Sequence, residues 1–291
     1  MNYTPLRYPG GKSLMTSFFI DLFKYNDMKD IVYVEPFAGG AGAAVNLLVS
    51  GNVKSICIND ANVGIYSFWK SLVSEPERLI AKVFETPVTL SEWRFQRDIY
   101  KNSDSPSLEL GFAVFFLSRT NRSGIISAGP IGGSSDEKQA SAKYKIDCRF
   151  NKKDLIKRME RIAENANSIQ VYNMDALDFI NIIPENAFVY LDPPYFVKGQ
   201  CLYMNHYTEC DHHNLSESLK SASFKWLLSY DDVSKIREIY QGFDLYNFPL
   251  AYTASNVRNG VELITHSRNI KFPERPVIKR GKNNDIGLIK I

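Results

Sequence analysis

The sequence lacks several signals that would place it in a specialised class of protein. It has only four cysteines in 291 residues, Cys57, Cys148, Cys201 and Cys210, and no two of them form a close pair. This spacing is typical of loop residues in a reducing cytosol rather than of a disulfide framework. No apolar run is as long as a membrane span, and no basic segment followed by an apolar core opens the chain. We therefore expect a cytoplasmic protein without a membrane anchor or signal peptide.

Complete metal and phosphate-loop motifs are also missing. Cys201, Cys210 and three nearby histidines could be imagined as a zinc site, but their spacing fits no compact metal motif, and we expect no metal. Gly11-Lys12-Ser13 would end a phosphate loop only if a glycine stood at Leu6 and a strand came before it. What remains is a glycine turn that delivers Lys12 to the start of a helix.

The net charge of +3 is small, but the basic residues are unevenly distributed. The stretch from Arg119 to Arg161 contains eleven basic residues and only five acidic ones. Such an excess is expected of a surface that follows phosphates, although a solvated helix face would explain residues 152–161 equally well. The basic residues are Arg119, Arg122, Lys138, Lys143, Lys145, Arg149, Lys152, Lys153, Lys157, Arg158 and Arg161. A second basic run extends from Arg268 to Lys282.

Four predicted strands are each followed closely by an acidic residue. The strands are residues 31–35, 55–59, 168–172 and 187–191, which are short and mostly apolar. The acids are Glu35, Asp60, Asp175 and Asp192. Open α/β sheets bind ligands at the carboxyl ends of their strands, so acids along one such rim indicate a polar cofactor. The alternative is a generic sheet whose acids only cap the following segments.

The first of these strands leads into a glycine-rich loop, Pro36 to Gly42, and then into a small apolar helix, residues 43–49. This arrangement is typical of a nucleotide-binding βα turn, in which glycines let the backbone approach a ligand, although it is not Gly-x-Gly-x-x-Gly. Asp60 follows the glycines by about 20 residues, where an acid would meet ribose hydroxyls. Glu35 could pair with an ammonium group.

The tetrapeptide Asp192-Pro193-Pro194-Tyr195 follows the buried strand 187–191. Two prolines force a rigid, extended exit from the sheet, which fixes the backbone carbonyls. If Asp192 and the Pro193 carbonyl both accept hydrogen bonds from an exocyclic aromatic amine, its lone pair is directed outward and can attack an electrophilic methyl. Tyr195 would hold the base by face stacking. A turn whose Asp192 merely caps the next segment is the plainer interpretation.

Between the second and third of these strands the pattern is mostly helical, ending in a basic helix from residue 150 or 151 to about 166. The polar segment 118–124 interrupts it, and residues 125–135 are expected to form an exposed loop or hairpin. Arg119, Asn121 and Arg122 carry side chains that read base edges or bind phosphates. We further expect a polar loop over residues 196–213 and late strands at 224–229 and 261–265.

Taken in order, five motifs resemble those of Dam-type (alpha-group) adenine-specific DNA methyltransferases, which use S-adenosylmethionine. The motifs are Arg7-Tyr8-Pro9-Gly10-Gly11-Lys12, Glu35-Pro36-Phe37-Ala38-Gly39-Gly40, Asp60, Arg119-Thr120-Asn121-Arg122-Ser123-Gly124 and Asp192-Pro193-Pro194-Tyr195. The resemblance covers residues 3 to about 265. It implies an α/β fold: a Rossmann-like sheet with helices on both faces and a mainly helical, basic target-recognition insertion. The catalytic domain would comprise residues 1–61 and 167–291, and the insertion residues 62–166.

The resemblance also implies roles for individual residues. Asp192, Pro193, Pro194 and Tyr195 would hold a flipped adenine. S-adenosylmethionine would contact Tyr8, Gly10, Gly11, Lys12, Glu35, Phe37, Gly39, Asp60, Asp175 and Asp192. DNA would contact Arg119, Asn121, Arg122, Lys143 and Lys145. One departure is Ala41, which stands where many relatives carry a second glycine.

The partner implied by the resemblance is double-stranded DNA, with a monomeric enzyme at the nucleoid of a bacterium or encoded by a phage. A restriction endonuclease encoded alongside would be a second partner. Two other functions remain open: methylation of cytosine or of an RNA adenine, and a DNA-binding regulator that binds the cofactor without turnover.

Overall fold

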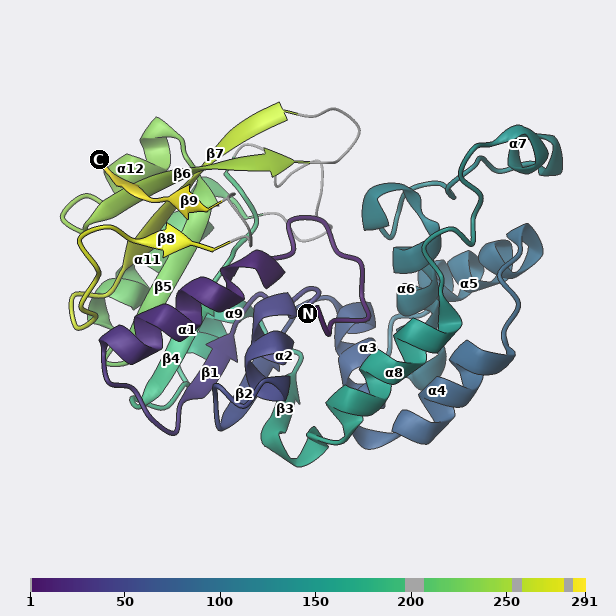
Figure 1. Cartoon of the computed structure of the whole chain (residues 1–291), viewed down its shortest axis with the longest axis horizontal. Helices are drawn as coiled ribbons and strands as arrows, with labels where there is room; N and C mark the ends of the chain where they lie inside the picture. The colour runs from purple at the N-terminus through teal and green to yellow at the C-terminus, as the bar shows by residue number, and fades with distance from the viewer. Residues whose placement is uncertain (1, 197–206, 253–257, 280–284) are drawn as a thin grey trace.

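A computed structural model describes residues 2–196, 207–252, 258–279 and 285–291 (Figure 1). Its centre is an eight-stranded sheet with the order β10-β6-β7-β5-β4-β1-β2-β3. Strands β3, β2, β1, β4 and β5 are parallel, whereas β7 is antiparallel to both β5 and β6. The strands are β1 (Val32–Glu35), β2 (Ser55–Asn59), β3 (Ile169–Tyr172), β4 (Ala187–Leu191), β5 (Lys225–Asp231), β6 (Leu245–Tyr252), β7 (Arg258–His266) and β10 (Ile289–Lys290). A separate pair, β8 (Val277–Ile278) and β9 (Ile286–Gly287), is antiparallel.

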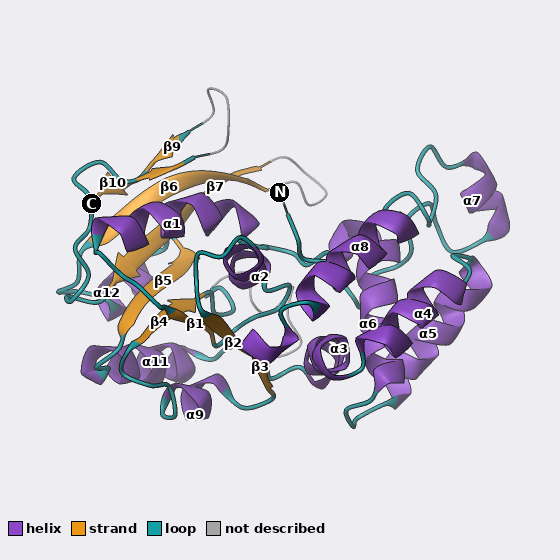
Figure 2. Ribbon diagram, turned by 60° about the horizontal axis from the view of Figure 1, so that its bottom comes forward, coloured by secondary structure: helices purple, strands orange, loops and turns teal. Residues whose placement is uncertain are grey.

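Helices cover both faces of the sheet, as Figure 2 shows. On one face α1 (Thr16–Tyr25) and α2 (Gly42–Val49) share a hydrophobic cluster with Tyr33 and Phe188. On the other face α9 (Ala176–Ile180), α11 (Glu209–Ser221) and α12 (Ser234–Ile239) share a second cluster with Val34 and Val189. Because both faces are buried, these strands are almost continuously apolar. The predicted α/β, Rossmann-like fold is confirmed.

The segment between β2 and β3 is a helical lobe beside the sheet (Figure 1). It contains α3 (Val63–Ser74), α4 (Pro76–Glu85), α5 (Leu90–Asn102), α6 (Leu108–Thr120), α7 (Asp136–Ser141) and α8 (Lys152–Ala163). Helices α3 and α6 pack closely, since a Cβ on Gly111 would approach backbone atoms of Ser67 to 2.7 Å. Its aromatic residues belong to the same cluster as one face of the sheet, so the core is continuous between the two parts. The division at residues 62 and 166 therefore stays a prediction.

Two expectations differ from the structure. The loop predicted for residues 196–213 ends earlier, because α11 begins at Glu209, where Thr208 and Asp211 form a capping box; residues 197–206 of that loop lie outside the described residues. Strand β6 was not predicted, since Pro249 within an apolar run argues against a central strand. Pro249 is accommodated because the neighbouring β10 pairs only with Tyr246 and Asn247. Among the described residues, no helix has the length and apolar character that crossing a membrane requires.

Candidate active site

A cavity of about 280 Å³ lies at the carboxyl ends of β1, β2 and β4. All ten residues predicted to contact a cofactor line it: Tyr8, Gly10, Gly11, Lys12, Glu35, Phe37, Gly39, Asp60, Asp175 and Asp192. The sequence analysis missed other lining residues, notably Asn62, Leu177, Tyr207 and Asp211. Of these, Tyr207 and Asp211 come from the chain around the start of α11, which gave no motif of its own.

The N-terminal segment enters this cavity through a tight turn at Tyr8-Pro9-Gly10-Gly11. The Gly11 amide donates to the Tyr8 carbonyl at 3.3 Å, and Gly10 has a φ of 73°. Proline followed by a glycine with positive φ is the signature of a type II turn. The turn places Lys12 inside the protein, where its side chain is 5% exposed.

The glycine loop after β1 packs against this same segment. A Cβ on Gly39 would lie 2.7 Å from the Tyr8 ring, and one on Gly42 would lie 2.2 Å from the Ser13 hydroxyl oxygen. We predicted that the loop glycines admit a ligand, but these two admit the N-terminal segment of the chain itself. Ala41, the departure from the family pattern, adopts a left-handed conformation with a φ of 42°, which few residues other than glycine favour.

Three of the four rim acids accept hydrogen bonds from backbone amides. Glu35 accepts from the Ala44 amide at 3.0 Å, and Asp60 accepts from the Gly39 and Asn62 amides at 2.8 and 2.9 Å. Asp175 caps α9 through the Leu177 amide at 2.8 Å. The capping interpretation is therefore correct for Asp175, whereas the N-caps of α2 and α3 are Ala41 and Asn62. The rim acids also line one cavity, which capping does not require.

Burial perturbs two of the rim acids, Glu35 and Asp60. Burial raises the pKa of Glu35 to about 8, although the Ala44 amide and the Tyr33 hydroxyl oppose the rise. Burial likewise raises the pKa of Asp60 to about 6, against the amides of Asn62 and Gly39. Neither carboxyl forms an ion pair within the described part of the chain. A ligand that brings an ammonium group or hydroxyl donors would stabilise both as anions.

A fully buried asparagine, Asn59, stabilises the strand ends that form the rim. Asn59 donates to the carbonyls of Pro36 and Met174 at 3.0 and 3.1 Å and accepts from the Met174 amide at 2.9 Å. These bonds connect the chain after β1, β2 and β3. One sequence signal for this role is that Asn59 is a polar residue at the end of a strand with an apolar centre.

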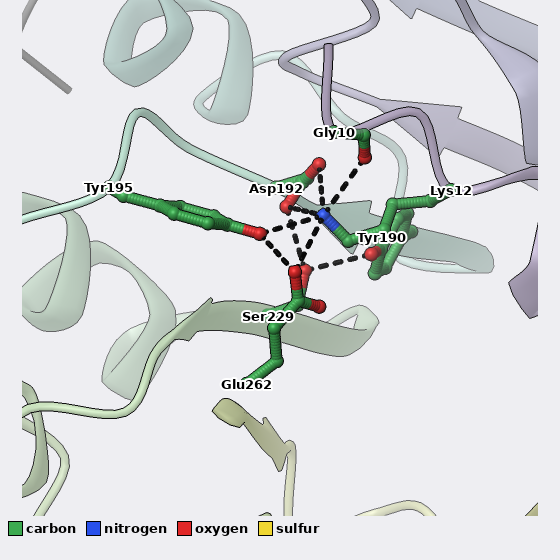
Figure 3. A network of polar contacts seen from close by, with 7 residues as sticks. All are labelled: Gly10, Lys12, Tyr190, Asp192, Tyr195, Ser229 and Glu262. Atoms are coloured by element: carbon green, nitrogen blue, oxygen red, sulfur yellow. Dashed lines mark hydrogen bonds and ion pairs between the residues drawn. The ribbon is translucent and has the colours of Figure 1, made fainter. Parts of the chain in front are cut away.

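Lys12 and Asp192 form the centre of a second polar cluster, drawn in Figure 3. Lys12 Nζ donates to both Asp192 carboxylate oxygens at 2.7 and 2.8 Å, to the Tyr195 hydroxyl at 3.0 Å and to the Gly10 carbonyl at 3.2 Å. Ser229 Oγ donates to Asp192 Oδ1 at 2.9 Å and contacts the Tyr190 hydroxyl at 2.8 Å. Burial works against the charge of Lys12, but Asp192 and Glu262 hold its pKa well above the usual range.

Tyr195 is held by this cluster and is not presented to the cavity. Its side chain is 6% exposed, and its hydroxyl donates to Glu262. Asp192 and Pro194 line the cavity, whereas Pro193 and Tyr195 are not among its lining residues. The stacking role of Tyr195 stays a prediction, because a base would reach the ring face only after the ring or the chain covering it moves.

The predicted DNA contacts divide into two groups. Arg119 Nε donates to the Pro5 carbonyl at 2.6 Å, and burial lowers the pKa of Arg119 to about 10. Asn121 is fully buried: Oδ1 accepts from Trp93 Nε1 at 2.6 Å, and Nδ2 donates to the carbonyls of Ile125 and Ile126. We therefore correct the prediction that Asn121 contacts DNA, because its amide is used inside the protein.

The other three predicted DNA contacts, Arg122, Lys143 and Lys145, have exposed side chains. For them DNA contact stays a prediction. The imagined zinc ligands are not assembled in the described part: His212 is buried with Nδ1 2.7 Å from the Tyr230 hydroxyl, and Cys210 is exposed. Cys201 and His206 lie outside the described residues.

A doubly covered, mainly parallel sheet with a glycine loop after β1, an acid after β2 and Asp-Pro-Pro-Tyr after β4 defines a methyltransferase of Rossmann-like fold. The family model of the D12 class N6 adenine-specific DNA methyltransferases matches residues 8–253. The chain belongs to this family and is an adenine-specific DNA methyltransferase.

Individual relatives are distant. The type II methyltransferase M.MjaIII of Methanocaldococcus jannaschii is 24% identical over 234 residues, which cover 73% of this chain and 78% of that protein. Among solved structures, protein LPL1258 from Legionella pneumophila has a TM-score of 0.32 and 12% identity, with 89% of this chain and 85% of that one covered. The rRNA methyltransferase AviRa from Streptomyces viridochromogenes has a TM-score of 0.36 and 12% identity, with 97% and 86% covered.

Proposed function

We propose that this enzyme transfers a methyl group from S-adenosylmethionine to the exocyclic amine of an adenine flipped out of duplex DNA. The observation that carries the proposal is the position of Asp192, which lies at the end of β4 and lines the cavity that also contains the rim acids. A cofactor held along the rim and a base amine held at Asp192 would then meet in one place.

The cavity fits the polar groups of the cofactor. Glu35, buried and without an ion-pair contact among the described residues, would take the ammonium group, and Asp60 would take the ribose hydroxyls. Phe37, Leu177 and Asp175 offer two apolar side chains and one acceptor on the cavity wall for the adenine. When bound, the cofactor supplies an electrophilic methyl on a sulfonium.

Asp192 and the Pro193 carbonyl would accept the two hydrogens of the target amine and turn its lone pair outward. The residues of the chain would act mainly by position, since alignment of reacting groups accounts for much of the rate enhancement in such displacements. The charge of Asp192 also favours the positive charge that develops on the attacking nitrogen. The rigid exit imposed by the two prolines keeps these acceptors in place.

Residues 62–166 would form the target-recognition part, with Arg122, Lys143 and Lys145 on the DNA-facing side. Their exposure supports phosphate contacts, which position a protein on DNA without reading its sequence. We further propose a monomer acting at the nucleoid. The name of the relative M.MjaIII, a type II methyltransferase, supports the proposal that a restriction endonuclease accompanies this enzyme.

The test is to incubate the protein with unmethylated duplex DNA and a methyl-labelled cofactor, and then to digest the DNA to nucleosides. Labelled N6-methyl-2′-deoxyadenosine is the expected product. Label in cytosine would mean that the target is cytosine, and label in RNA supplied instead of DNA would mean that the substrate is RNA. Cofactor binding without any label transfer would favour the regulator, which the intact Asp192-Pro193-Pro194-Tyr195 segment argues against.

A further inference from the structure

Glu262, in the middle of β7, is a second carboxylate next to the residue proposed to hold the target amine. Its side chain is fully buried, and it pairs across the sheet with Asp231 of β5. Nothing in the sequence assigned it a role, and it lies beyond residues 8–253, which the family model matches. A buried carboxylate in the centre of a strand is costly unless its charge is compensated.

Two members of the polar cluster around Asp192, Lys12 and Tyr195, compensate the buried charge of Glu262. Its Oε1 lies 3.6 Å from Lys12 Nζ and accepts a hydrogen bond from the Tyr195 hydroxyl. Glu262 belongs to β7, which is separated from β4 by β5, and Figure 3 shows Lys12 Nζ between the carboxylates of Asp192 and Glu262. Lys12 is therefore shared, closely with Asp192 and more loosely with Glu262.

This sharing matters because Lys12 uses the same acceptors that a target amine needs. Both Asp192 oxygens accept from Lys12 Nζ, and one of them also accepts from Ser229. These three bonds leave the Asp192 carboxylate about one of its four acceptor sites, so Lys12 and the amine compete for a nearly saturated acceptor. A buried ammonium cannot lose its partners without another anion nearby, and the only movement needed to reach one is the short shift toward Glu262.

Resting on the proposed function, we propose that Glu262 is a positioning residue for methyl transfer: it takes Lys12 from Asp192 when the target amine arrives and fixes the Tyr195 hydroxyl. Glu262 acts through Lys12 and Tyr195 and does not itself touch the base. Without its charge, Lys12 stays on Asp192 and competes with the amine. Without its hydrogen bond, the Tyr195 ring loses the contact that sets its orientation.

The test compares wild-type enzyme with Glu262→Gln, which keeps the shape of the side chain and removes its charge. Three quantities are measured: cofactor affinity by calorimetry, single-turnover methylation of duplex DNA, and the fluorescence of 2-aminopurine placed at the adenine that the wild type methylates. We expect unchanged cofactor affinity and a single-turnover rate reduced about 10- to 100-fold, as misplaced reacting groups produce. The fluorescence rise on binding should shrink with it.

Thr265→Val is the matched control. Thr265 is fully buried on the same strand, and its hydroxyl oxygen has no hydrogen-bond partner among the described residues. This variant disturbs β7 without touching the cluster, so its methylation rate should remain that of the wild type. An equal loss of rate in both variants would mean that β7 merely supports the fold.

A double variant tests the route of action. If Glu262 acts through the cluster, Glu262→Gln combined with Tyr195→Phe loses less than the product of the two single losses, because Glu262→Gln weakens the Tyr195–Glu262 hydrogen bond and Tyr195→Phe removes it. Multiplicative losses, an unchanged rate in Glu262→Gln, or a fall in cofactor affinity as large as the fall in rate would each overturn the inference. Should Glu262→Gln fail to fold in thermal unfolding, Tyr195→Phe alone decides: slower transfer with normal cofactor affinity supports the inference, and an unchanged rate overturns it.

These outcomes are distinct from failure of the proposed function. If the wild type forms no N6-methyladenine in DNA, the proposed function is wrong. If the wild type methylates and Glu262→Gln methylates equally well, only the role of Glu262 is wrong.

Discussion

The two regions that the sequence marked for function, the strand-end rim and the polar segment after α6, turn out differently in the structure. All the predicted rim residues line one cavity. After α6, Asn121 is buried and its side-chain amide is hydrogen-bonded inside the protein, while the next residue, Arg122, is exposed. A residue's position in the fold therefore predicts its role better than its residue type does. Acids after parallel strands converge on one edge, whereas polar residues after a helix can face inward or outward.

The largest expected effect lies at the rim. Asp192→Ala should reduce methyl transfer by about 10³-fold or more, because it removes the charged acceptor of the target amine. DNA binding should persist, since the exposed basic residues of the helical lobe are unchanged. Single-turnover kinetics and an electrophoretic mobility assay check the two parts. Retained turnover would remove Asp192 from the mechanism and make the rim a purely structural feature.

The second-largest effect is expected for Tyr195→Ala. Stacking of a base on an aromatic ring contributes about 1–3 kcal/mol, so base capture, read from 2-aminopurine fluorescence, should weaken roughly 5- to 150-fold. Cofactor affinity should change far less, because the ring is not among the residues that line the cavity. Equal losses in both measurements would contradict a separate role for Tyr195.

Asn121→Ala tests the second region, the polar segment after α6. Removing the amide leaves the Trp93 indole and two carbonyls without their partner, which should lower the free energy of unfolding by about 1–3 kcal/mol. Arg122→Ala is the matched control, since Arg122 is exposed and its loss should leave stability unchanged. Chemical denaturation measures both. A stable Asn121→Ala protein with weakened DNA binding would restore the original prediction for Asn121.

The rim also predicts a dependence of stability on pH in the cofactor-free protein. The pKa of Glu35 is raised from 4.5 to about 8, so the folded state holds a proton that the unfolded state has lost. Stability from this group is complete below pH 4.5 and disappears as the pH rises to 8. Between pH 6 and 8 Asp60, with a pKa of about 6, has largely ionised, so the remaining decline reports Glu35.

Glu35→Gln should flatten that decline, by roughly 1–3 kcal/mol over two pH units. Unfolding in denaturant at a series of pH values provides the measurement. An identical slope in wild type and variant would mean that Glu35 is ionised in the folded protein already.

The smallest effect is expected at the tip of the helical lobe. Lys143→Ala and Lys145→Ala should each lower the slope of log K against log salt concentration by about 1 if each residue contacts one phosphate. Stability should not change, because both side chains are exposed. A slope that stays the same in both variants would place the DNA elsewhere on the surface.

The sequence predicted best those elements whose position follows from one local pattern of residues. The ranges predicted for β2 and β4 agree with the structure at both ends because both are short strands with an apolar centre, and β4 is buried at every residue. The rim acids could be predicted because they follow such strands. Lys12 could be placed at the site because a proline-glycine turn precedes it.

Ser229 and Glu262 could not be predicted, since they stand inside strands and reach the site only through sheet pairing. Ser229 contacts Asp192 across 37 residues of sequence, and Glu262 contacts Tyr195 across 67. Neither has a local pattern around it that differs from ordinary strand sequence. Asn121 was misjudged for the opposite reason, because a polar pattern does not reveal whether its partners lie inside the protein.

The most direct test of the account is to map modified bases in unmethylated genomic DNA after incubation with the wild-type enzyme and S-adenosylmethionine. We predict N6-methyladenine confined to one short sequence motif. Modification of another base, or none at all despite cofactor binding at the rim, would contradict the assignment of Asp192 as the residue that holds the adenine amine.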